Sequence, residues 1–256
     1  MSLYPWTGVL LASVGAAARG ADRPDAIVAS IQRSWIENAA VDGSAASLDW
    51  VHPIARGSIS ILGASWKQVG AYHRLLADIG GEAHPADARY SFGGDLDVGP
   101  VEDGGNNYYH LQTSEHVSHD VTAGHSVVAE HRYISAGALH GQLLSAAWRY
   151  APRPTLTFEL KQALTVSGNL GSRATSARLD YLGAAQMFTG AAVGRAAPQL
   201  VDAPIAVRGD FSQYYVGLAL PIGSTTFTVV VDRYVTDSSR QWNTTLVASV
   251  PLPDRR

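Results

Sequence analysis

Cysteine is absent from the 256 residues of this sequence. Its absence excludes a disulfide framework, thiolate metal sites and cysteine nucleophiles. Charged residues are scarce as well: they make up 16% of the chain, below the roughly 25% of ordinary soluble domains. Basic residues are scattered, no basic run is longer than Arg255-Arg256, and the formal net charge is −3, so nucleic acid is not an expected partner. A chain with so few charges is expected to keep part of its surface away from water.

Long apolar runs are also missing. The stretch Trp6–Ala18 is apolar and ends in small residues with an A-x-A pattern, which is typical of a secretory signal peptide cleaved after Ala18. A buried N-terminal helix is the alternative. This stretch falls well short of the ~20 residues of a spanning helix, and no other stretch is long and apolar enough. Membrane residence would therefore have to come from a β-barrel.

The domain organisation predicted is a signal peptide at 1–18, a short N-terminal lead-in at 19–46 and one β-barrel domain at 47–252. Within the lead-in, Ile27, Ile31 and Trp35 follow one another at intervals of four residues, behind a proline-containing start signal. This spacing predicts one short helix over 26–38.

From about Ser58 to Val250, apolar and polar residues alternate with a period of two. In the stretch 155–164, for example, Leu156, Phe158 and Leu160 share one face of a strand, and the residues between them share the other. Strands of about ten residues with one apolar and one polar face are the signature of a transmembrane β-barrel. The sequence predicts an all-β, antiparallel, up-and-down transmembrane β-barrel of about 12 strands. Candidate strands are 47–52, 58–66, 71–80, 88–98, 107–116, 121–133, 139–150, 155–165, 175–183, 185–193, 207–220, 226–234 and 242–250.

The connections between candidate strands differ in character along the chain. Tight, proline-marked turns occur at 52–57, 152–154 and 221–224, whereas longer polar or glycine-rich stretches occur at 99–106, 167–173, 195–206 and 235–241. Short turns at one end and longer loops at the other are typical of membrane barrels, with the short turns in the periplasm. Aromatic residues near the strand ends, among them Trp66, Trp148 and Trp242, would form girdles at the two membrane interfaces.

Charged residues on the polar faces of consecutive candidate strands are the candidate functional residues. These are Arg149, Glu159, Lys161, Arg178 and Asp180. In a closed barrel they would line the lumen, where Arg149, Glu159 and Lys161 are expected to pair across strands. Two interpretations stay open: a salt-bridged plug that fills the interior, and the lining of a path for a solute.

Histidine and serine residues between 116 and 135 suggest two other kinds of chemistry. The string HVSHD, with His116, His119 and Asp120, contains imidazole and carboxylate metal ligands, but its spacing does not place them on one face of a strand. His131 and Ser135 share the parity that a base and a nucleophile on one strand would need. No G-x-S-x-G motif is present. We therefore expect no metal, no cofactor and no catalytic residue, and keep a hydrolase with His131 and Ser135 as an alternative.

Three stretches of the chain resemble small outer-membrane β-barrel proteins of Gram-negative bacteria, most nearly the YaiO-like group. They are TAGHSVVAEHRY at 122–133, WRYAPRPTLTFEL at 148–160 and FTVVVDRYVTDSSRQWNTTLVASVPL at 227–252. The resemblance covers residues 47–252 and implies a barrel similar to the C-terminal export pores of exopolysaccharide secretion systems. It also implies assembly by the barrel assembly machinery.

The function expected is that of an outer-membrane β-barrel, structural or transporting, with a link to envelope polysaccharide. Its expected partners are outer-membrane lipid, lipopolysaccharide, the barrel assembly machinery and a polysaccharide or small solute. Two alternatives from other classes remain. One is an outer-membrane hydrolase that modifies lipid or lipopolysaccharide, and the other is a soluble periplasmic β-sandwich that binds a ligand, in which the apolar faces would pack against a second sheet.

Overall fold

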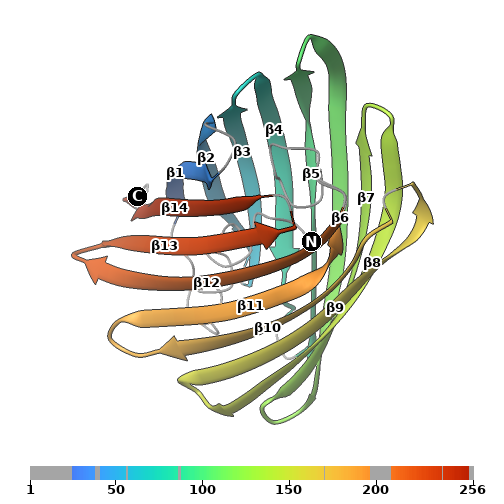
Figure 1. Ribbon diagram of the computed structural model, residues 1–256. Coiled ribbons are helices and arrows are strands. Elements are labelled where there is room, and N and C mark those ends of the chain that lie inside the picture. Colours follow the sequence, from blue (N-terminus) through green and yellow to red (C-terminus); the bar gives the residue numbers. More distant parts are fainter. Residues whose placement is uncertain are drawn as a thin grey trace.

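A computed structural model shows one closed antiparallel β-barrel (Figure 1). The structure describes residues 25–37, 41–55, 57–85, 88–169, 171–196, 209–237 and 239–253. Fourteen strands follow one another around the barrel in chain order. They are β1 (Ala26–Glu37), β2 (Val41–Ala55), β3 (Ser58–Val69), β4 (Tyr72–Ala83), β5 (Tyr90–Asp103), β6 (Asn106–Thr122), β7 (His125–Ala136), β8 (Leu139–Arg153), β9 (Leu156–Gly168), β10 (Arg173–Leu182), β11 (Gln186–Ala196), β12 (Gly209–Ile222), β13 (Thr225–Thr236) and β14 (Arg240–Pro251).

The barrel closes where its first strand meets its last. β1 pairs with β14 from Ala26 opposite Pro251 to Glu37 opposite Arg240, and Figure 1 shows the blue β1 beside the red β14. Inside this seam, Val28 and Val247 are buried together with Val51 and Ile59. Closure matters because an open sheet would leave a row of unpaired backbone N–H and C=O groups at each edge.

The two rims of the barrel differ in their connections. Both ends of the described chain lie at one of them, where the Leu252 amide donates to the Asp25 carbonyl over 2.6 Å; we call it the termini rim. The opposite rim, called the loop rim, carries the longest connection, between Ala196 of β11 and Gly209 of β12. Not every connection there is long: β5 and β6 are joined by Gly104-Gly105 alone, both with positive φ, as a two-residue hairpin turn requires. The loop expected over 99–106 is therefore mostly strand.

The two faces of the barrel wall have opposite chemistry. Large apolar side chains such as Leu48, Leu62 and Leu160 are more than half exposed on the outer face. Charged side chains such as Lys67, Arg132 and Asp232 lie on the inner face and are at most 5% exposed. A soluble sandwich would bury its apolar face, whereas this wall turns that face outward.

One cross-strand row on the outer face connects the two rims. Its members are directly opposite one another on successive strands, from the first residue of β5 at the termini rim to the beginning of β2 at the loop rim. They are Tyr90, His119, Val127, Trp148, Leu160, Ala177, Ala191, Tyr214, Arg233, Trp242, Trp35 and Asp42. Such a row rises from rim to rim because barrel strands are tilted relative to the barrel axis.

Two predictions from the sequence were wrong. The barrel has 14 strands and not about 12, and the segment expected to be a helix over 26–38 is β1. Ile27, Ile31 and Trp35 are four residues apart, and an interval of four keeps residues on one face of a strand as well as of a helix. The barrel therefore begins inside the expected lead-in. The predicted signal peptide falls outside the described residues, and within the described part no helix is long and apolar enough to cross a membrane.

Because the chain has no native cysteine, the seam can be tested with an engineered disulfide. Ser30 and Val247 are directly opposite on β1 and β14, at the Cα separation of about 5 Å that a disulfide accepts. We expect Ser30→Cys with Val247→Cys to form a disulfide on mild oxidation, measured by mass spectrometry and by faster non-reduced migration of the denatured chain. Ser30→Cys with Leu246→Cys is the control, since these side chains point to opposite faces. Free thiols in a folded Ser30–Val247 double variant would contradict the closure.

Candidate functional site

The inner wall over β8, β9 and β10 carries the charged residues that the sequence singled out. Arg149, Glu159, Lys161, Arg178 and Asp180 lie between outward-facing neighbours, so they face the interior of the closed barrel. Their outward neighbours include Trp148, Phe158, Leu160 and Tyr181, each at least 40% exposed. Strand alternation thus places the five charges on the interior surface.

These five residues form ion pairs, but not all across strands. Arg149 on β8 donates through Nε to Glu159 of β9 over 2.5 Å, as expected for cross-strand neighbours. Arg178 instead pairs along its own strand, and its Nε donates to both carboxylate oxygens of Asp180 over 2.9 Å. Lys161 does not bind Glu159; its Nζ donates to Glu130 of β7.

Glu130 is the centre of the most enclosed of these clusters. It accepts hydrogen bonds from Arg132, from Lys161 and, over 3.1 Å, from the Ser145 hydroxyl. The side chains of Glu130, Arg132 and Lys161 are 15%, 5% and 23% exposed. Charge-assisted hydrogen bonds of this kind are strong where water is scarce. The Glu130 carboxylate therefore pairs with two cationic side chains, Arg132 of β7 and Lys161 of β9.

An acidic strip lies on the inner face of β2, β4 and β5, and one strand, β6, separates its Asp95 from Arg132 of this cluster. Its members are Asp49, Asp78, Asp95 and Asp97. Asp97 accepts a hydrogen bond from the Gln112 amide over 3.1 Å, and Asp95 accepts one from the Ser114 hydroxyl. Gly63 lies between Asp49 and Asp78, and a Cβ there would collide with a carboxylate oxygen of each. The missing side chain of Gly63 therefore makes room for both carboxylates.

A third inner cluster combines Asp232 with amides. Asp232 on β13 is 2% exposed and accepts hydrogen bonds from Asn243 over 2.9 Å and from Gln213 over 3.3 Å. Two inner aromatic rings lie nearby, those of Phe188 on β11 and Tyr215 on β12, with centroids 6.5 Å apart. Arg178 reaches this part of the wall as well, since its guanidinium carbon lies 5.1 Å from the centroid of the Phe188 ring.

The histidine-rich segment is divided between the two faces of the wall. His116 and Asp120 of β6 face the interior, whereas His119 of β6 and His131 of β7 face outward. The described residues contain no group of three or more His, Asp or Glu side chains that could hold a metal ion.

The two residues of the hydrolase alternative are not brought together. His131 and Ser135 share the outer face of β7, but four residues along a strand span about 13 Å, far beyond a hydrogen bond. The Nδ1 atom of His131 instead lies 3.2 Å from a carboxylate oxygen of Glu115. The residue directly across from Ser135 is His140 of β8, and within the described chain no hydrogen bond joins these two side chains. The geometry therefore does not place His131 as a base for Ser135.

Several inner charges were missed by sequence reasoning: Asp49, Asp78, Lys67, Arg74 and Arg132. The signal was present in the same period of two. Arg132 follows Glu130 by two residues, so the two must share a face. Lys67 and Arg74 lie directly opposite each other on β3 and β4 and are 5% and 7% exposed. Arg74 falls within the candidate strand 71–80, and Lys67 follows the candidate strand 58–66 by one residue, so parity would have placed both on the polar face.

The Glu130 cluster can be tested through stability. Glu130→Gln removes the charge that offsets Arg132 and Lys161, and breaking an enclosed ion pair costs about 3–5 kcal/mol. We expect a correspondingly lower free energy of unfolding in detergent, measured by urea titration with tryptophan fluorescence. The matched control is Glu115→Gln, whose side chain is 70% exposed beside His131 and should cost about 1 kcal/mol or less. Equal effects of the two changes would contradict a special role for Glu130.

Comparisons with known proteins identify the fold and no family. No family model matches the sequence, and no curated protein sequence matches it. Solved structures do match: the CymD monoaromatic hydrocarbon channel has a TM-score of 0.68 at 9% identity, over 98% of this chain and 94% of CymD. A mutant of the TodX monoaromatic hydrocarbon channel has a TM-score of 0.63 at 9% identity, over 91% of each chain. The Ralstonia pickettii toluene transporter TbuX has 0.58 at 10% identity, over 90% of each. At such low identity these likenesses show a shared closed-barrel fold.

Proposed function

We propose that this protein is an outer-membrane channel of a Gram-negative bacterium and that small polar solutes cross the membrane along its inner wall. The observation that carries the proposal is the distribution of side chains in a closed barrel. Apolar side chains are exposed on the outer face and charged side chains are enclosed on the inner face, the opposite of a soluble protein. Only a closed barrel or a helix satisfies every backbone group within lipid. The fold shared with hydrocarbon channels and a toluene transporter supports a transport role.

The solute class is proposed from the inner wall. The acidic strip and the Glu130 cluster present charged and hydrogen-bonding groups on β2, β4, β5, β7 and β9. An apolar solute that passes such groups displaces water from them and offers no hydrogen bond in return, which costs free energy. From β2 to β5 the inner wall carries the four aspartates of the strip and two cationic side chains, Lys67 and Arg74. Carboxylates outnumber cationic groups there, so polar solutes and cations are favoured over hydrocarbons.

The charge of this strip generates a prediction for conductance. Asp95→Asn with Asp97→Asn should reduce the cation-to-anion permeability ratio by about twofold or more, because rings and strips of carboxylates select cations. The measurement is the reversal potential in planar phospholipid bilayers across a salt gradient. The matched control is Asp42→Asn, on the outer face at the loop rim. Unchanged selectivity in a double variant that still conducts would show that solutes do not pass the acidic strip. Absence of conductance in the unchanged protein would overturn the channel proposal.

Export is proposed through a signal peptide cleaved after Ala18. The A-x-A pattern at 16–18 supports it. Fractionation of cells that express the full chain should recover the protein in the outer membrane, with different migration of boiled and unboiled samples on a detergent gel. Sequencing of the recovered protein should give Arg19 as its first residue. Recovery in the soluble fraction without a migration shift would overturn the membrane assignment.

We further propose that the transported solute is envelope polysaccharide or a fragment of it. The support for this proposal is the resemblance of the stretches at 122–133, 148–160 and 227–252 to YaiO-like barrels. The barrel assembly machinery is proposed as the partner that inserts the chain. Loss of the protein should then lower the amount of extracellular polysaccharide, measured by sugar analysis of the medium, and the Asp95/Asp97 double variant should fail to restore it.

A further inference from the structure

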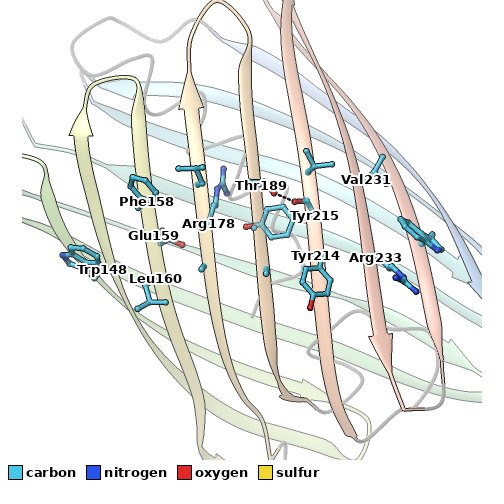
Figure 2. Close-up of a pocket in the computed structure, with 16 residues that line it drawn as sticks. Trp148, Phe158, Glu159, Leu160, Arg178, Thr189, Tyr214, Tyr215, Val231 and Arg233 are labelled. Atoms are coloured by element: carbon cyan, nitrogen blue, oxygen red, sulfur yellow. Dashed lines mark hydrogen bonds between the residues drawn. The ribbon is translucent and has the colours of Figure 1, made fainter.

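A hollow of about 820 Å³ lies in the barrel wall over β8 to β14. Two adjacent cross-strand rows of outward-facing residues line this hollow on the outer face of the wall. One is the middle of the row defined above, from Trp148 to Trp242, and the other consists of Phe158, Leu179, Thr189, Val216 and Val231. Figure 2 shows Trp148, Phe158 and Leu160 at one side of the hollow and Tyr214 and Arg233 at the other.

The hollow exists because side chains at its floor are small. Ala177 and Ala191 occupy the central positions of the first row, directly opposite each other on β10 and β11. Large side chains stand on either side, so the hollow is an elongated apolar groove that follows the rising row. It runs from Trp148 towards Arg233, which is three strand-to-strand steps from the end of the row at the loop rim.

Arg233 is the one arginine that lines the outer side of this groove. Two other outward arginines nearby have carboxylate partners: Arg33 donates to Asp42 over 2.6 Å, and Arg240 lies 3.7 Å from Glu37. Arg233 lies instead against a ring, with its guanidinium carbon 5.3 Å from the centroid of Trp242. Its Nε is buried and has no hydrogen-bond acceptor within the described residues.

An outward arginine on a membrane strand is costly unless it lies near the interface, and a buried N–H without an acceptor is costly anywhere. A phosphate group would remove both costs, since guanidinium groups bind phosphate through paired hydrogen bonds. Trp242 and Tyr214 flank this position with rings that favour the interface. The polar end of the groove is therefore suited to an anionic headgroup, and its apolar part to an acyl chain that extends towards the membrane interior.

We propose that this groove binds one lipid A unit of lipopolysaccharide, with a lipid A phosphate on Arg233 and an acyl chain between Tyr214 and Trp148. The inference rests on the proposed function, because the loop rim faces outward only if the barrel spans the outer membrane. That orientation follows from the position of the longest connection and of the chain ends, since longer loops are extracellular in such barrels. Lipopolysaccharide is the phosphate-bearing lipid of the leaflet on that side.

The test is binding of purified full-length barrel to bisphosphorylated lipid A in mild detergent, with stoichiometry and affinity measured by native mass spectrometry. We expect one lipid A per barrel, and about tenfold weaker binding to Arg233→Gln, which loses the charge-assisted bond. Arg240→Gln is the matched control, because this exposed arginine on the next strand pairs with Glu37. Its affinity should stay within about twofold of the unchanged protein.

A second pair of variants tests the apolar part of the groove. Ala191→Leu fills the floor and should weaken lipid A binding, whereas Ala64→Leu adds the same bulk on the outer face of β3, away from the groove, and should not. Each variant must retain the migration shift of a folded barrel. Unchanged binding of the Arg233→Gln or Ala191→Leu barrel would overturn the site. Equal binding of dephosphorylated lipid A or of phosphatidylglycerol would overturn lipid A phosphate as the ligand.

Conductance separates this inference from the channel proposal. The selectivity measurement uses bilayers made of phospholipid alone, so it needs no lipid A. A barrel that conducts but binds no lipid A would overturn the lipid site and leave the channel standing. A barrel that binds lipid A through Arg233 and never conducts would overturn the channel alone.

Discussion

Hydrogen bonding between β1 and β14 is the constraint on which the rest of this structure depends. Without that seam the wall would be an open sheet with two unpaired edges, and apolar residues on its outer face could not be left in lipid. With the seam, every strand has two neighbours. A chain of low charge content can then expose its apolar residues outside and enclose its charges, which is the arrangement that the proposed channel needs.

Closure also determines how the enclosed charges are compensated. Side chains on the inner face meet partners from other strands: Arg149 meets Glu159 of the adjacent strand, and Lys161 reaches across β8 to Glu130. These contacts restrain β7, β8 and β9 relative to one another. The acidic strip on the other strands has amide and hydroxyl donors, such as Gln112 and Ser114. Ion pairs thus dominate the interior over β7 to β10, whereas four carboxylates and the side chains of Lys67 and Arg74 share the interior over β2 to β5.

The period of two was sufficient to find most of the fold. Each of the thirteen candidate stretches overlaps a different one of the strands β2–β14, and the parity of Glu159 and Phe158 assigned them to opposite faces. The first strand was missed because Ile31 and Trp35 fit a helix and a strand equally well, which left thirteen candidate stretches for a barrel of fourteen strands. Partner choice could not be read from the pattern either. Whether Lys161 binds Glu130 or Glu159 depends on the register between strands and on side-chain reach, and a list of alternating residues contains neither.

The cross-strand row from Tyr90 to Asp42 has a consequence for how this wall should be mapped. Residues that are directly opposite on adjacent strands are not at equal depth, because each step along the row moves a little nearer the loop rim. The register between strands therefore shows how far each residue lies from the loop rim, as well as which residues are neighbours. If the barrel is placed in a membrane as proposed, a single probe moved from Val127 to Leu160, Ala191 and Trp35 passes from one interface through the hydrocarbon to the other. Its changing environment would then measure the tilt of the strands in the bilayer.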